Sequence, residues 1–204
     1  ERISGLLHGR GVVFEGIYSF NMSRDTKKAN AGFAGMGRGK RIILSDTLVK
    51  EFTPGEITVI FAHELGHYRL MHLWKGLGLT SGIILFSFYL CGQAYAATVA
   101  AMGFNGLHEI PAIPILILYL SVVGVLIKPA TNAFSRAHER EADRYPQEAT
   151  GDAASFISSM ERLADMNLSD RDPHPVVEFL FHGHPSIRKR IAFAEGWRGD
   201  RLTS

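Results

Sequence analysis

Hydrophobic and polar positions alternate in short runs over the first quarter of this 204-residue chain. Residues 11–22 are rich in Val, Phe, Ile and Tyr and partly alternate, and residues 41–44 form a short apolar run, so both segments predict strands. The Gly-rich segment 30–37 predicts a third strand or an exposed sheet edge, with a flexible loop as the alternative. We expect these segments to form a small antiparallel sheet, with a less regular set of loops as the alternative.

The pattern then changes to helical spacing. Residues 1–10 predict a short helix, and Ser45 with Asp46 predicts the start of another that runs to about residue 51. Thr53 as N-cap, followed by Pro54 and by Glu56 of a capping box, predicts the start of a third helix. Its apolar residues keep helical spacing, and we expect this helix to reach about residue 74.

Two long apolar stretches without any charged residue follow, at residues 76–104 and 110–127. About 20 apolar residues are enough to cross a bilayer, so we predict transmembrane helices at about 77–104 and 110–128. Pro111 and Pro114 lie near the start of the second stretch, where a helix tolerates proline. A pair of buried helices in a soluble core is the alternative, which two adjacent uncharged runs of this length disfavour.

Charged residues that flank these stretches predict an orientation. Arg69 and Lys75 precede the first stretch, whereas the loop between the two stretches contains neither Lys nor Arg. Lys128, Arg136 and Arg140 follow the second stretch. The positive-inside rule therefore predicts a multi-pass integral membrane protein whose segments before and after the hairpin both face the cytoplasm.

Composition excludes several classes of protein function and several kinds of site. The chain is 46% hydrophobic with a net charge of +2, which gives no case for nucleic-acid binding. Cys91 is the single cysteine, so an intrachain disulfide and a Cys-rich metal site are both excluded. The length suits one domain over residues 1–204, and a start at Glu1 rather than Met indicates a fragment or a processed product.

Candidate chemistry lies in the third predicted helix, where residues 63–67 read H-E-L-G-H. On a helix, His63 and His67 share one face, about one turn apart, and two imidazoles placed in this way can hold a zinc ion. Glu64 lies beside that position and can accept a proton from the water that zinc activates. A chance match with two core histidines is the alternative, but the capped helix around the motif favours a metal site.

A third ligand is needed, because H-E-x-x-H sites use three protein ligands and leave a position for water. The predicted hairpin returns the chain to the same side of the membrane just before residues 135–143 (SRAHEREAD), which offer His138, Glu139, Glu141 and Asp143. Glu139 and Asp143 share a helical face, whereas Glu141 points elsewhere. We therefore expect Glu139 as ligand, with Asp143 hydrogen-bonded to a ligand histidine. Residue 73 is Leu, which removes the three-histidine motif.

Five segments in this order carry a resemblance to a known family: NAGFAG (30–35), RIILSDTLV (41–49), AHELGH (62–67), SRAHEREAD (135–143) and HGHPSIRKR (182–190). The chain resembles, from about residue 11 to 197, the membrane zinc metalloproteases that include type I CAAX prenyl endopeptidases and bacterial heat-shock membrane proteases. The segments SDTLV and AHELGHYRLMH are more similar to the CAAX branch than to the heat-shock branch.

The resemblance implies a gluzincin-type α+β fold, mainly helical, with a small sheet and with the two-helix membrane hairpin inserted between the H-E-x-x-H helix and the third-ligand helix. It implies one zinc ion per chain and a set of site residues: His63, His67 and Glu139 as ligands, Glu64 as general base, Asp143 as support, His184 and Arg190 as stabilisers of the transition state, and Asn30, Ala31 and Gly35 on an edge strand that pairs with the substrate backbone.

The expected function is an integral-membrane zinc endopeptidase that acts on a peptide or protein substrate. A quality-control protease of the heat-shock type and a non-catalytic metal-binding membrane scaffold are the alternatives. The chain departs from the family pattern at Gly183, where Ser or Thr is common. Pro146 is a second irregular feature, and we expect it to kink or end the third-ligand helix.

Overall fold

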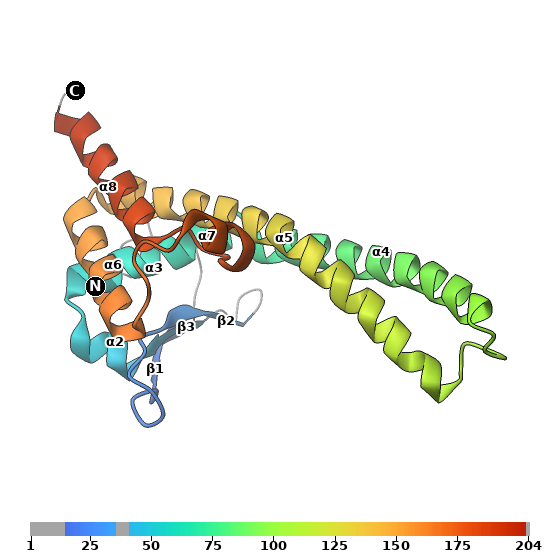
Figure 1. Ribbon diagram of the computed structural model, residues 1–204. Helices are drawn as coiled ribbons and strands as arrows, with labels where there is room; N and C mark the ends of the chain where they lie inside the picture. Colours follow the sequence, from blue (N-terminus) through green and yellow to red (C-terminus); the bar gives the residue numbers. More distant parts are fainter. Residues whose placement is uncertain (1–14, 36–40, 203–204) are drawn as a thin grey trace.

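The structure is a computed structural model that describes residues 15–35 and 41–202 (Figure 1). The helix expected at residues 1–10 and parts of the strands expected at 11–22 and 30–37 lie outside the described residues. The described part has a body, formed by a small sheet and several helices, and a long two-helix arm that projects from it. The expected fold class, α+β and mainly helical, is confirmed.

Three strands form the sheet: β1 (Gly16–Phe20), β2 (Ala31–Ala34) and β3 (Arg41–Ser45), in the order β1-β3-β2. β2 pairs antiparallel with β3, whereas β1 pairs parallel with β3. The expectation of an antiparallel sheet was therefore wrong for β1. A parallel pair needs a long crossover connection, and the segment between β1 and β3, which contains β2, supplies that length.

Both expected helix starts next to the sheet are confirmed. Ser45 caps α2 (Asp46–Glu51) by accepting a hydrogen bond from the Leu48 amide. Thr53 and Glu56 form the capping box of α3 (Pro54–Arg69): the Thr53 hydroxyl accepts from the Glu56 amide at 3.3 Å, and the Glu56 carboxylate accepts from the Thr53 amide at 2.7 Å. One face of α3 packs on the sheet and on α2 through a buried apolar cluster of Ile42, Leu44, Leu48, Phe52, Ile60, Phe61 and Leu65.

The helix with the H-E-x-x-H motif ends earlier than the expected residue 74. α3 stops at Arg69, and α4 (His72–Ala101) begins after a break at Met71, whose φ of 57° is in the left-handed region. This conformation costs a non-glycine residue about 1–2 kcal/mol. The spacing of apolar residues gives no sign of such a break. The break separates α3 from α4, and His72, at the start of α4, is almost completely buried.

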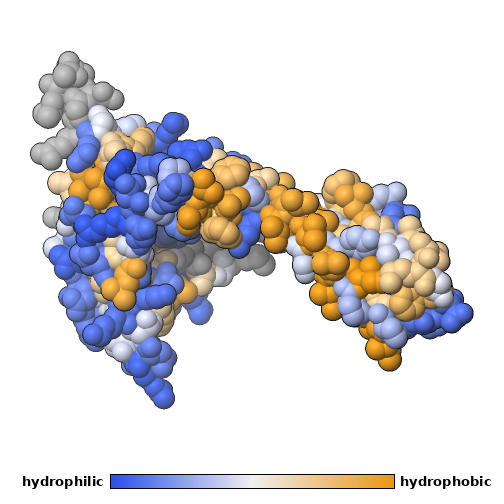
Figure 2. Space-filling view, in the orientation of Figure 1, coloured by the Kyte–Doolittle hydropathy of each residue, from blue (hydrophilic) through white to orange (hydrophobic). Residues whose placement is uncertain are grey.

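The arm consists of α4, a short 3-10 turn η1 (Ile110–Ala112) and α5 (Ile113–Thr150). Both long helices are long and apolar enough to cross a membrane, which confirms the two expected helices with shifted boundaries. Only 17% and 6% of the residues in their most apolar windows are buried, so these are not core helices of the body. Figure 2 shows the contrast between the largely hydrophilic body and the hydrophobic sides of the arm.

α5 is continuous from the arm into the body, so the second apolar helix and the expected third-ligand helix are one element. Pro146 lies inside α5, which continues to Thr150, so this proline does not end the helix, and a kink there stays a prediction. The side chain of Pro146 is buried. The Thr150 hydroxyl donates to the Pro146 carbonyl at 2.8 Å and so helps to close the last turn.

The body is completed by α6 (Ala153–Asn167), α7 (Pro175–Phe181) and α8 (Ile187–Leu202). A second buried cluster joins α3, α6 and α8 through Val59, Phe156, Met160 and Ala194. α3 also packs closely against α5 at Gly66, where an added Cβ would lie 2.9 Å from Cβ of Tyr145 and 3.3 Å from Cα of Ala142. Glycine at this position therefore sets the short distance between the helix of the motif and the helix of the expected third ligand.

Candidate metal centre

Three expected ligands meet where α3 and α5 pack together. The Nε2 atoms of His63 and His67 are 3.1 Å apart. Oε2 of Glu139 lies 3.5 Å from Nε2 of His63, and Oε1 of Glu139 lies 3.3 Å from Nε2 of His67. His63 and Glu139 are buried and His67 is partly buried, so the group lies at the bottom of a depression rather than on an open surface.

The spacing of these atoms fits zinc. Ligand atoms at about 2.0–2.1 Å from a tetrahedral zinc ion are about 3.3 Å from one another. The three observed separations, from 3.1 to 3.5 Å, are close to that value, with Oε2 of Glu139 facing His63 and Oε1 facing His67. Two imidazoles and one carboxylate are also a donor set that zinc prefers.

Asp143 supports this group from one turn further along α5. Its Oδ1 atom lies 2.9 Å from Nδ1 of His63, an arrangement that leaves Nε2 of that ring directed at the ligand group. Arg190 on α8 donates to both carboxylate oxygens of Asp143, at 2.6 Å and 2.8 Å. The expected contact of Asp143 with a ligand histidine is therefore present in the structure.

Nearby charges keep the carboxylates of Asp143 and Glu139 ionised. Both residues lie in the part of α5 that follows its apolar stretch. Burial alone would raise the pKa of Asp143, but Arg190 and His63 outweigh it and hold the pKa at about 2. Burial likewise opposes ionisation of Glu139, and His67 and His63 outweigh it, so the pKa of Glu139 is lowered. Both groups are anions at neutral pH, as a cation site requires.

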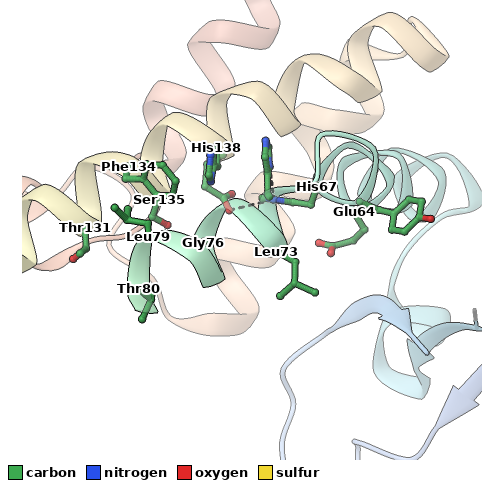
Figure 3. A pocket seen from close by; sticks show the side chains of 13 residues that line it. Glu64, His67, Leu73, Gly76, Leu79, Thr80, Thr131, Phe134, Ser135 and His138 are labelled. Carbon is green, nitrogen blue, oxygen red and sulfur yellow. Dashed lines mark hydrogen bonds and ion pairs between the residues drawn. The ribbon is translucent and has the colours of Figure 1, made fainter. Parts of the chain in front are cut away.

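Glu64 and His67 line a cavity of about 510 Å³ between α3, α4 and α5 (Figure 3). Apolar residues form much of its wall, among them Leu73, Leu79 and Phe134. Burial raises the pKa of Glu64, His63 and His67 oppose the shift, and Glu139 reinforces it. A carboxylate whose pKa is raised from its ordinary value is a better proton acceptor, which suits a general base.

His184 reaches the group from the loop between α7 and α8, with Nε2 3.4 Å from Oε1 of Glu139 and a side chain that is 68% exposed. Arg136 on α5 anchors this loop: its guanidinium donates to the carbonyl oxygens of Glu178 at 3.0 Å and His182 at 2.6 Å. Gly183 lies against Ser135, whose hydroxyl oxygen would be 3.2 Å from an added Cβ. His184 therefore has one open side while its loop is fixed to α5.

The expected substrate-pairing residues lie at the edge of the sheet. β2 starts at Ala31 and occupies one end of the strand order, next to α3. The backbone of Asn30 pairs with the end of β3: its carbonyl accepts a hydrogen bond from the Ser45 amide, and its amide donates one to the Ser45 hydroxyl. Gly35 follows the strand with a φ of 87°, which favours glycine.

Arg190 lies behind the candidate ligands, on the side of Asp143. Its guanidinium is almost buried and pairs with Asp143, and it lies 3.9 Å from Glu139. In the structure it supports the carboxylates behind the ligands. A direct role at the substrate stays a prediction.

Sequence reasoning overlooked His72 and gave Arg136 only a topological role. Nδ1 of His72 lies 2.9 Å from Nδ1 of His67, and its Nε2 lies 3.0 Å from Oε2 of Glu141. On a continuous helix, a histidine five residues after His67 would lie on a different face and could not reach it. The break at Met71 ends the helix between them and allows the contact. The chain pattern carries no signal for this break.

The fold and the site have the arrangement of an H-E-x-x-H metal centre whose third candidate ligand comes from a distant helix. The chain belongs to peptidase family M48, whose model matches residues 1–198. It is similar to the uncharacterized metalloprotease YhfN of Bacillus subtilis, with 38% identity over 96% of this chain, and to a probable CAAX prenyl protease 1 of Schizosaccharomyces pombe, with 31% identity over 86%.

Among solved structures, the crystal structure of S. mikatae Ste24p matches 95% of this chain with a TM-score of 0.82 and 25% sequence identity. The expected resemblance, nearer to the CAAX branch, is therefore confirmed. The chain spans less than half of these proteins: 47% of YhfN, 37% of the S. pombe relative and 49% of the Ste24p chain.

Proposed function

We propose that this chain carries the catalytic centre of an integral-membrane zinc endopeptidase of the CAAX-protease type. The observation that carries the proposal is the convergence of His63, His67 and Glu139, whose nearest nitrogen and oxygen atoms are 3.1–3.5 Å apart, close to the spacing of zinc ligands. The names of the relatives, which include metalloprotease and CAAX prenyl protease, support the same activity.

His63, His67 and Glu139 would hold the metal, and zinc bound there would supply Lewis-acid chemistry, acidifying water and polarising a peptide carbonyl. Glu64 accepts the proton of the attacking water and later donates it to the leaving amine. His184, exposed and next to Glu139, donates a hydrogen bond to the carbonyl oxygen as negative charge develops there. Asp143 holds the ring of His63 in the orientation that this chemistry needs.

Substrate binding would use the edge of the sheet. A peptide that adds as a strand to β2 gains backbone hydrogen bonds with little sequence selectivity. β2 contacts α3, the helix that carries Glu64, which supports this edge as the place where a substrate strand would add. Asn30, Ala31 and Gly35 mark the start and the end of this edge. The apolar cavity next to Glu64 would accept an apolar side chain or a lipid group of the substrate.

The third ligand provides the direct test of the metal site. In the full-length protein, purified in detergent, Glu139→Ala is expected to lose most of its zinc, measured by mass spectrometry as ions per chain. Glu148→Ala removes an exposed carboxylate nine residues further along α5 and is the matched control. Unchanged zinc in Glu139→Ala would overturn the ligand assignment.

The substrate class is tested separately. A panel of prenylated CAAX peptides, their unprenylated counterparts and an unstructured casein-like protein distinguishes the two proteases expected from the sequence. Faster cleavage of prenylated peptides supports a CAAX-type substrate. Preferential cleavage of the unstructured protein would instead assign a quality-control role to the same chemistry.

The orientation follows from charge. With Arg69 and Lys75 at one end of the hairpin and Lys128 at the other, the metal centre would face the cytoplasm, and the loop at residues 102–109 would face outward. A cysteine introduced at Gly106 tests this, because native Cys91 is buried. Labelling of Gly106→Cys by a membrane-impermeant maleimide in intact cells is expected, and labelling only after lysis would reverse the orientation.

A further inference from the structure

The short helix α7 carries its apolar side chains on the outside. Four of its seven residues are apolar and 41–61% exposed: Val176, Val177, Phe179 and Phe181. Glu178, in contrast, is 5% exposed, and its carboxylate faces the body, where it pairs with Nζ of Lys189 at 2.7 Å. A surface helix in water has the opposite arrangement, with its apolar face buried and its charged residues outside. The outer face of α7 therefore fits an apolar environment better than water.

Hydrogen bonds from α5 fix the position of α7. The side-chain amide of Asn132 donates to the Leu180 carbonyl at 2.7 Å, and the buried Arg136 donates to the carbonyls of Glu178 and His182. Backbone carbonyls at the end of a helix lack partners within the helix, so these donors stabilise the end of α7. The outward direction of the apolar face therefore results from the packing of α7 on α5.

The level of α7 along α5 coincides with the expected membrane boundary. Twenty residues of α5, from Ile113 to Asn132, span about 30 Å, the thickness of the hydrocarbon core of a bilayer. Asn132 is the residue that contacts Leu180. One turn earlier, Lys128 is the first charged residue after the apolar stretch, and its Nζ lies 5.6 Å from the centre of the Phe181 ring. α7 therefore lies where the apolar part of α5 ends.

The surroundings of the apolar face resemble those of a helix at a membrane surface. In Figure 2 the hydrophobic surface of the arm continues onto the part of the body where α7 lies. Cations border this face: Lys128 lies over Phe181, and the exposed Arg140 and Lys189 line a cavity of about 220 Å³ together with Glu178. An apolar helix face bordered by Lys and Arg is typical of helices that lie in the interface of a bilayer with anionic lipids.

We propose that α7 lies in the membrane–water interface, where Phe179 and Phe181 enter the boundary between headgroups and acyl chains and where Lys128 and Arg140 face lipid phosphate groups. The proposed partner is a bilayer surface that contains anionic lipids. Within residues 15–35 and 41–202, no carboxylate pairs with Lys128 or Arg140. A protein segment over this face would bury both cations, which costs free energy unless it brings carboxylates with it. A bilayer surface supplies phosphate groups instead.

This position of α7 would also set the height of the candidate metal centre above the bilayer. α7 leads into the loop that carries His184, and Glu139 follows Asn132 by seven residues, about 10 Å along α5. Contact of α7 with the bilayer would keep both residues close to the membrane surface, so the peptide bonds within reach are those near that surface. This consequence rests on the proposed function, whereas the position of α7 does not.

Site-directed spin labelling tests the position of α7 in the full-length protein, reconstituted in vesicles of phosphatidylcholine and phosphatidylglycerol. A nitroxide is attached to Phe179→Cys or to Phe181→Cys after replacement of any other reactive cysteine; Cys91 is buried. Electron paramagnetic resonance then measures collisions with oxygen, which concentrates in the bilayer, and with a water-soluble nickel chelate. Leu126→Cys on the arm and Leu168→Cys on the body, where the native side chains are 72% and 93% exposed, are the lipid and water references.

Both α7 labels are expected to give an oxygen-to-nickel collision ratio severalfold above that of Leu168→Cys and below that of Leu126→Cys. A ratio equal to that of Leu168→Cys at either position would place α7 in water and overturn the proposal. Low collision rates with both reagents would show that protein covers this face, which also overturns it. An unfolding temperature equal to that of wild type verifies that each labelled chain is folded. None of these outcomes depends on peptidase activity, so the proposed function is tested separately.

Discussion

Asp143 on α5 and His63 on α3 lie 80 residues apart in the sequence and 2.9 Å apart in the structure, from Oδ1 to Nδ1. The contact joins the helix that carries two expected ligands to the helix that carries the third. It also fixes the side of the His63 ring that faces Glu139 and His67. The hairpin of α4 and α5 makes the contact possible, because it returns the chain from the far end of the arm to the body.

Replacement of this carboxylate is expected to weaken the metal site without removing a ligand. Asp143→Asn leaves His63 without an ionised partner, and loss of such a partner typically costs about 10–100-fold in metal affinity. The dissociation constant for zinc, measured by competition with a chelator, is expected to rise by that factor. Asp165→Asn, which changes an exposed carboxylate on α6, is the control; equal affinities in the two variants would contradict the supporting role of Asp143.

Gly66→Ala tests whether the close packing of α3 on α5 builds the site. The new Cβ would lie 2.9 Å from Cβ of Tyr145 and 3.3 Å from the Ala142 backbone, so α5 must move away. We expect a loss of about 1–3 kcal/mol in unfolding free energy, since overpacking outweighs the higher helix propensity of alanine. Faster zinc release should accompany it. Gly82→Ala, where an added Cβ meets open space, should not lower the unfolding free energy and should leave the rate of zinc release unchanged.

His184→Ala is expected to lower kcat by about 10²–10³-fold, the cost of losing one donor to a developing oxyanion. Zinc content should stay unchanged, because this histidine is not one of the three ligands. Parallel measurement of kcat and of zinc per chain separates the two effects. A variant that loses zinc together with activity would show that His184 acts on the metal site itself. His108→Ala, at the far end of the arm, is the control.

Glu56 predicts a pH dependence of stability that is separate from the metal. Burial would raise its pKa, but hydrogen bonds from Ser158 and from Thr53 outweigh it, so the pKa is lowered from the ordinary 4.5. A lowered folded-state pKa means that the contribution of Glu56 is complete above the unfolded-state value. It is lost as pH falls through the folded-state value.

Glu56→Gln should therefore cost about 1 kcal/mol in unfolding free energy at pH 7, the usual magnitude for a helix cap. The difference from wild type should shrink below pH 4.5, where the wild-type carboxylate gains its proton. Thermal unfolding in detergent at a series of pH values measures it, with Glu148→Gln as an exposed control. A difference that grows as the pH falls would contradict the sign of the shift.

Sequence patterns predicted those elements whose signals are local. The capping box at Thr53 and Glu56, the N-cap at Ser45 and the two apolar helices all depend on residues close in the chain, and each was found as expected. The position of the candidate third ligand was also accessible, because helical spacing groups Glu139 with Asp143 and the hairpin explains their return to the two histidines. The separation of 72 residues between His67 and Glu139 did not prevent the inference.

Features that depend on tertiary structure were missed. The break at Met71 needs a left-handed residue that has no sequence signal, and without it His72 has no route to His67. The parallel pairing of β1 with β3 depends on the path of the segment between them. Pro146 does not end α5, because tertiary packing overrides the cost of a proline in a helix. The pairing of Arg190 with Asp143 likewise depends on how α8 packs on α5.

Glu64→Gln tests the central claim most directly, since glutamine keeps the size of the side chain and removes its ability to accept a proton. Zinc per chain and the rate of peptide cleavage should be measured on the same preparations of wild type and variant. We predict zinc content equal to wild type and a cleavage rate lower by about 10²–10⁴-fold. Cleavage at the wild-type rate in a variant that still holds zinc would contradict the account.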